Sequence, residues 1–72
     1  MNENIILNYP LKVLFAPDLE TVLYARQGGE VFMDEHNIQW IKFVADNGPG
    51  VGKLHMFRTE DIVIVRDDDV TS

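Results

Sequence analysis

Cysteine is absent from this sequence, and hydroxyl side chains and basic residues are scarce. Without thiols the chain can form neither disulfides nor a thiolate zinc site, and their absence favours a reducing compartment, which we expect to be the cytoplasm. The aliphatic hydroxyls are limited to Thr21, Thr59, Thr71 and Ser72, so candidate nucleophiles are few. We therefore expect that the protein is not an enzyme.

Acidic residues outnumber basic ones by twelve to six, which gives a formal net charge of −6. Such a chain repels phosphate backbones and anionic lipids, so the charge disfavours nucleic-acid and membrane partners and favours a basic protein partner. No apolar run approaches the roughly 18 residues that a membrane-spanning helix needs. Residues 1–4 carry an acid where a secretion signal has basic residues, so we expect no export by that route.

The length of 72 residues is enough for one domain and not for two. We predict a single β-rich domain over residues 1–66 and an acidic, flexible tail over residues 67–72, which begins with consecutive aspartates. A core this small has no disulfide to support it. It must depend on side-chain packing or on a partner subunit, and a homodimer is one arrangement that would supply the latter.

Alternating apolar residues predict a strand from Ile5 to Phe15, with Asn8 and Lys12 on the opposite parity. Pro10 cannot donate to a ladder, so we expect a bend, a bulge or a sheet edge at that position. Further strands are predicted over residues 30–33, 38–45, 53–58 and 62–65.

The segment 17–27 fits two periods. As a helix it would have Pro17 in its first turn and Gly28 at its end. As a strand it contains the β-forming run Thr21–Ala25 between two turn signals. Ala16 is a poor helix cap, so the strand is favoured and the helix is the alternative.

The segment 46–52 contains three glycines, a proline and an Asn-Gly pair, which predict the loop of a hairpin. A single turn is expected at residues 59–61, with the Thr59 hydroxyl accepting from a nearby backbone N–H, before the last strand. This order is similar to the arrangement in SH3-like small barrels. The resemblance is architectural, covers about the last half of the chain and has no sequence motif behind it.

These patterns predict an all-β fold, either a curled sheet of five to six strands or an SH3-like barrel, since closure removes exposed sheet edges. The alternative is an α+β fold in which one helix over residues 17–27 packs on an antiparallel sheet.

No cofactor or metal site is predicted. Gly48–Lys53 resembles a phosphate loop, but the first glycine of that motif would fall on Asn47, its Ser/Thr would fall on Leu54, and a strand follows instead of a helix. The two histidines have no metal-binding spacing. His36 lies in a polar turn, and His55 alternates with apolar neighbours and is expected to point away from the core.

The segment 38–45 is apolar on both parities. A strand in a small sheet normally exposes one face to water, so either another element covers the second face or Trp40 is exposed. Core packing is the alternative for Trp40, but tryptophan and tyrosine are frequent at binding hot spots. We predict a partner-binding patch at Trp40, Lys42, Ile38 and Tyr24.

The sequence thus predicts a non-catalytic binding or regulatory module that acts by protein–protein contact, as a small inhibitor or adaptor of mobile-element type would. One alternative is a small barrel that binds single-stranded nucleic acid through aromatic platforms, which requires its basic residues to cluster on one face. The other is a metal-dependent enzyme that uses His36 or His55.

Overall fold

The computed structural model describes residues 4–67 and contains, within them, seven short strands and one 3-10 turn. The strands are β1 (Ile5–Leu7), β2 (Leu11–Phe15), β3 (Val22–Ala25), β4 (Gly29–Met33), β5 (Gln39–Val44), β6 (Leu54–Arg58) and β7 (Ile62–Arg66). The turn η1 (Thr59–Asp61) joins β6 to β7. The all-β prediction is confirmed, with more strands than expected.

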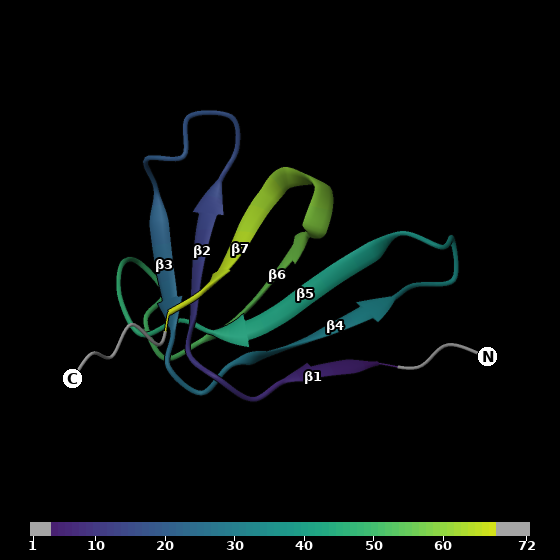
Figure 1. Ribbon diagram of the computed structural model, residues 1–72, viewed down its shortest axis with the longest axis horizontal. Coiled ribbons are helices and arrows are strands. Elements are labelled where there is room, and N and C mark those ends of the chain that lie inside the picture. The colour runs from purple at the N-terminus through teal and green to yellow at the C-terminus, as the bar shows by residue number, and fades with distance from the viewer. Residues whose placement is uncertain (1–3, 68–72) are drawn as a thin grey trace.

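The strands form two antiparallel sheets, which face each other (Figure 1). One sheet has the order β1-β4-β5-β6 and the other has the order β3-β2-β7. Within residues 4–67 no ladder joins β6 to β7, so the sheets are not closed into a barrel. The predicted order of hairpin, single turn and last strand is present, but in an open arrangement.

The helix alternative for residues 17–27 is wrong. The segment leads instead into β3, where Leu23 and Ala25 are buried and the residues between and before them are half-buried. This period of two is typical of a strand, and it turns Leu23 and Ala25 toward the core. Leu19 has a left-handed backbone conformation, with φ of 59°, which an α-helix does not allow.

The first predicted strand is divided in two. Residues 5–7 pair with β4 in one sheet, and residues 11–15 pair with β3 and β7 in the other. Pro10 lies between them, as its missing N–H predicts, and its carbonyl oxygen accepts from the Asp67 N–H at 2.7 Å. The first residue of the predicted tail is therefore attached to the domain, and residues 68–72 lie outside the described residues.

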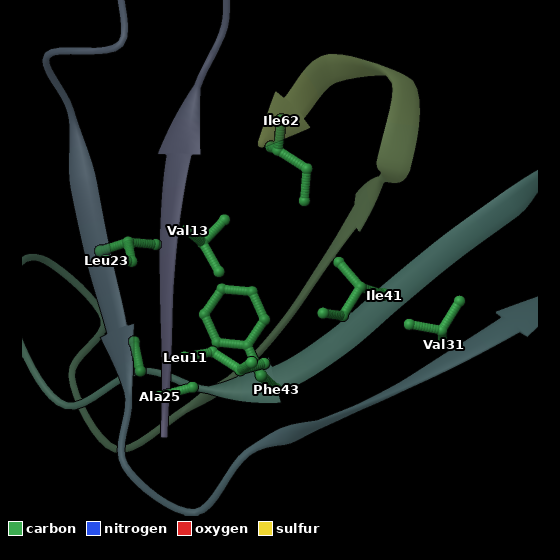
Figure 2. Close-up of a cluster of buried hydrophobic side chains, with 9 residues drawn as sticks. Leu11, Val13, Leu23, Ala25, Val31, Ile41, Phe43 and Ile62 are labelled. Atoms are coloured by element: carbon green, nitrogen blue, oxygen red, sulfur yellow. The ribbon is translucent and has the colours of Figure 1, made fainter. Parts of the chain in front are cut away.

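The core lies between the two sheets (Figure 2). Its most deeply buried large side chains are Leu11 and Val13 of β2 and Ile41 and Phe43 of β5. Burial of each such side chain stabilises the fold by about 1.5–3 kcal/mol. The other buried hydrophobic residues are Leu23, Ala25, Val31, Ala45 and Ile62.

The parity of β6 is the reverse of the one predicted. His55 lies on the core side, and its ring centroid is 6.0 Å from those of Phe43 and Phe57. Leu54 and Met56 face outward and are 60% and 48% exposed. Both parities of β6 carry apolar side chains, so the pattern alone does not say which side faces the core. The large ring of Phe57 faces inward, 5.9 Å from that of Phe43, and His55 lies on the same side of the strand as Phe57.

The turn η1 is bonded at both ends. The Ile62 N–H donates to the carbonyl oxygen of Thr59. The Thr59 hydroxyl donates to Oε1 of Gln39 at 3.0 Å, a contact that the sequence did not predict. This contact attaches the turn to β5.

The hairpin loop of the four-stranded sheet seals the edge of β3. Asn47 accepts from the Tyr24 N–H at 2.7 Å through Oδ1 and donates to the Val22 carbonyl at 3.0 Å through Nδ2. The Asp46 N–H donates to the Tyr24 carbonyl at 2.7 Å. These bonds satisfy backbone groups that a free edge would expose, and they connect the two sheets.

Gly28 closes the turn between β3 and β4 against β1. Its φ is 85°, and a Cβ at this position would lie 1.8 Å from the carbonyl oxygen of Leu7. Gly52 has a similar φ of 84°, but a Cβ there would meet nothing within 4 Å. The two glycines therefore share a backbone requirement and differ in the space around them.

Gly28→Ala should destabilise the protein more than Gly52→Ala. We expect Gly52→Ala to lower the free energy of unfolding by about 1 kcal/mol through backbone strain alone. Gly28→Ala should lower it by about 3 kcal/mol or more, because β1 must separate from β4 to admit the methyl group. Urea denaturation measures both values, and equal losses would contradict the close contact with Leu7.

Candidate functional site

Alternation along β4, β5 and β6 leaves a set of side chains on the side of the sheet away from the core. The register places these side chains in cross-strand rows, which β1 extends at one border. We call this surface the outer face. Its residues are Ile6, Glu30, Phe32, Trp40, Lys42, Val44, Leu54, Met56 and Arg58.

The outer face exposes large aliphatic side chains. Ile6 is 63% exposed, Leu54 60%, and Val44 and Met56 48% each. An antiparallel sheet with one face on a core usually presents polar side chains on its other face. Clustered apolar side chains on such a face are typical of a contact surface.

A groove of about 490 Å³ crosses one end of the outer face. Its apolar lining includes Ile6, Val44, Val51 and Leu54, and the backbone of Gly28 forms part of it. Two ion pairs border it, Lys42 with Glu30 and Arg26 with Asp46. The groove can thus accept an apolar group between charges that already have partners.

Trp40 is half-buried on the outer face and is not part of the core. Its indole N–H donates to Oδ2 of Asp34 at 2.9 Å, and the Arg58 guanidinium lies 5.7 Å from its ring centroid. One ring edge is therefore fixed by a hydrogen bond and one side of the ring is held near a cation. This arrangement gives the patch a rigid aromatic residue.

Lys42 lies next to Trp40 in the same strand and on the same face. Its Nζ is 3.6 Å from Oε1 of Glu30 and 5.6 Å from the ring centroid of Phe32. Asn4 also donates to Glu30. The charge of Lys42 is therefore neutralised on the sheet, while its methylene groups add to the apolar surface.

The structure brings together only part of the predicted patch. Trp40 and Lys42 share the outer face, and Ile38, half-buried, lines a small hollow beside Arg58 at its border. Tyr24 lies on the other sheet, opposite Lys12 in the β2–β3 register and facing away from the core. Tyr24 therefore does not belong to the same surface.

Of the nine outer-face residues, sequence reasoning named only Trp40 and Lys42, and it missed the exposed aliphatic residues Ile6, Val44, Leu54 and Met56. The expectation that His55 points away from the core implied that its neighbours Leu54 and Met56 face inward, and the structure shows the reverse. Ile6 lies on the opposite parity from the core-facing residues of the first strand, and this was the one signal that could have identified it.

Basic residues do not gather on the outer face as free charges. Among residues 4–67, Lys42 lies near Glu30, Arg58 near Glu60 at 3.5 Å, and Arg26 near Asp46 at 2.9 Å. The two cations of the outer face therefore add little net positive charge to it.

The glycine-rich loop and the two histidines were the other candidate sites that the sequence raised. Gly48, Gly50 and Gly52 have left-handed φ values and lead into β6, as expected for a hairpin loop. His55 Nε2 is 3.2 Å from the Gly50 carbonyl, and His36 is exposed. Among residues 4–67, no three potential metal ligands gather, and no helix has the length and hydropathy needed to cross a bilayer.

No protein-family model, curated protein or solved structure matches this chain. The outer face is therefore interpreted from its own geometry and chemistry.

Asp34 organises the turn that precedes β5. Its Oδ1 accepts from the N–H of Ile38 at 3.0 Å and of His36 at 2.7 Å, and its Oδ2 accepts from Trp40. The bonds from Ile38 and then from Trp40 favour the ionised form, so they lower the pKa of Asp34 below its ordinary value of 3.8. The carboxylate thus helps to orient Trp40.

Asp34→Asn should show how far this carboxylate stabilises the fold. Because its pKa is lower in the folded state, its contribution is complete above pH 3.8 and is lost as the pH falls through the lowered pKa. The amide can still accept from the backbone but cannot replace both carboxylate oxygens as acceptors. We expect the variant to be less stable at pH 7 and the difference to shrink near pH 3, in urea titrations followed by Trp40 fluorescence. A deficit that does not change with pH would contradict this role.

Proposed function

We propose that this protein is a non-catalytic binding module that contacts a protein partner through the outer face. The observation that carries the proposal is the exposure of Ile6, Val44, Leu54 and Met56 on one regular sheet surface, at 48–63% each. Covering such side chains removes apolar area from water, which is favourable by about 25 cal/mol per Å². A partner is the simplest source of that cover.

Aromatic residues at the centre of the outer face support the same function. Trp40 and Phe32 face each other across β4 and β5 and are both half-buried. Tryptophan is enriched among the few residues that dominate interface energies. The groove beside them offers a place for an apolar side chain of the partner.

The charge of the chain favours a partner with a basic border around an apolar contact. The net charge is −6, and the cations on the outer face are paired. Opposite charge on the partner would speed association and disfavour other partners. An acidic module with this surface would act by occupying a site on its partner, as an inhibitor or adaptor does.

Single-stranded nucleic acid is a less suitable occupant of this face. Stacking needs an open aromatic ring, but Arg58 lies over Trp40 and Lys42 lies over Phe32. Both cations also have carboxylate neighbours, so they are poorly placed to neutralise phosphates.

Trp40→Ala should leave the protein folded while weakening capture of its partner. The side chain lies outside the core, so circular dichroism should be unchanged and stability reduced by no more than about 1–2 kcal/mol. Loss of a hot-spot aromatic residue should weaken binding by about tenfold or more. Unfolding of the variant would place Trp40 among the residues that the fold requires and would contradict the patch.

Affinity capture from the native host, with the tagged protein as bait, tests the face as a whole. Leu54→Lys puts a charge on the outer face, and Val65→Lys puts the same charge on an exposed position, 42% accessible, of the other sheet. Partners that depend on the outer face should be lost with Leu54→Lys and retained with Val65→Lys. Equal recovery with both variants, or loss with Val65→Lys alone, would overturn the proposal.

A further inference from the structure

We infer that two copies of this protein pair through the free edge of β1. The strands run antiparallel about a two-fold axis at Ile6, so that the two four-stranded sheets join into one continuous sheet. The inference does not rest on the proposed function, because its tests use the protein alone.

The backbone of Ile6 points toward the free edge. The β4–β5 ladder begins where the Asp34 N–H donates to the Ile38 carbonyl at 3.0 Å. By the alternation of an antiparallel ladder, β4 bonds β5 through its even-numbered residues and β1 through Gly29 and Val31. The N–H and C=O of Ile6 therefore point away from β4, and β1 lies at the border of the sheet (Figure 1).

The charge pattern selects a second copy as the occupant of this edge. Residues 4–11 form the longest stretch of the sequence without a charged residue, in a chain of net charge −6. The charges nearest to this edge on the outer face are already paired, Glu30 with Lys42 and Arg26 with Asp46. Two acidic chains can therefore approach here without placing like charges opposite one another.

The register about Ile6 is self-complementary. It places Ile6 opposite Ile6 of the second copy on the outer face, and Ile5 opposite Leu7 on the core side. Ile6 and Ile5 are 63% and 53% exposed, so each would gain an apolar neighbour. Asn4 would lie opposite Asn8, where two amides can bond each other.

The other sheet edges are less suited to self-pairing. Asn47 and Asp46 already bond the edge of β3. The strand β7 is flanked by Asp61 and Asp67, so antiparallel pairing of two β7 strands would bring carboxylates of the two copies together. The edge of β6 is the competing site for pairing of two copies. The strand β6 ends directly in η1, where the Glu60 carboxylate lies near the Arg58 guanidinium.

Sedimentation equilibrium over about 1 μM to 1 mM protein tests pairing directly, in about 0.15 M salt to screen the net charge. A contact of a few strand residues is small, so we expect a monomer–dimer equilibrium with a Kd on the order of tens of micromolar. A monomer at every concentration, or growth beyond the dimer, would overturn the inference.

Two substitutions at one position separate backbone pairing from loss of fold. Ile6→Pro removes an N–H that makes no bond within the described chain, and Ile6→Lys places a charge at the seam. Each should raise the Kd by about thirtyfold or more, because both copies carry the substitution and both substituted residues lie at the contact. Val65→Lys, which puts the same charge on an exposed position of the other sheet, 42% accessible, is the control and should leave the Kd within about threefold. Circular dichroism checks that each variant is folded, and a dimer that survives Ile6→Lys would contradict the seam.

Electron-spin distance measurement then identifies which edge is used. The chain has no cysteine, so Leu54→Cys gives a single labelling site. Pairing through β1 separates the two β6 strands by the width of the joined sheet, about 34 Å at roughly 4.8 Å per strand. Pairing through β6 would bring the labels within about 20 Å, and that result would overturn the assignment to β1.

Discussion

The core that the two sheets share is the constraint on which the rest of the structure depends. Among the described residues it consists of nine buried hydrophobic residues, and β2 and β5 supply its most deeply buried side chains. Each sheet can bury only one face against this core. Within residues 4–67 no further element covers the opposite faces, so their apolar residues are exposed. The outer face is thus a direct consequence of building two sheets around a small core.

Local charge pairing accompanies this exposed apolar surface. Lys42 lies near Glu30 and Phe32, and Arg58 lies near Glu60 and Trp40. Each cation therefore contacts a carboxylate and a ring at once, which leaves the face with apolar area and little unpaired charge. The net charge of the whole chain is −6. The combination favours a contact that is apolar at its centre and electrostatically selective at its border.

Much of the fold follows from local patterns in the sequence. The alternation of β2, the two-faced apolar run of β5, the glycine-rich hairpin loop and the turn η1 were all predicted, because each depends on neighbours in the chain. The parity of β6 was not, because Leu54 and Met56 are as apolar as the residues beside them. The packing of Phe57 against Phe43, fourteen positions away in sequence, decides that parity.

The candidate site was predictable only in part for the same reason. Trp40 and Lys42 share a strand face, so sequence spacing places them together. Tyr24 was grouped with them on residue type alone, and the strand order puts it on the other sheet. The parity of Ile6 in the first strand indicates that it faces away from the core, but the register of β1 with β4, which joins it to the outer face, is not encoded locally.

Trp40 is the only tryptophan of the chain and lies on the outer face, so its fluorescence reports directly on whether a partner covers that surface. The most direct measurement is acrylamide quenching of Trp40 fluorescence in the free protein and in a stoichiometric complex with its captured partner. Any tryptophan of the partner is first replaced, so that the fluorescence comes from Trp40 alone. Contact through the outer face predicts a quenching constant several-fold lower in the complex. An unchanged quenching constant in a complex that has formed would contradict it.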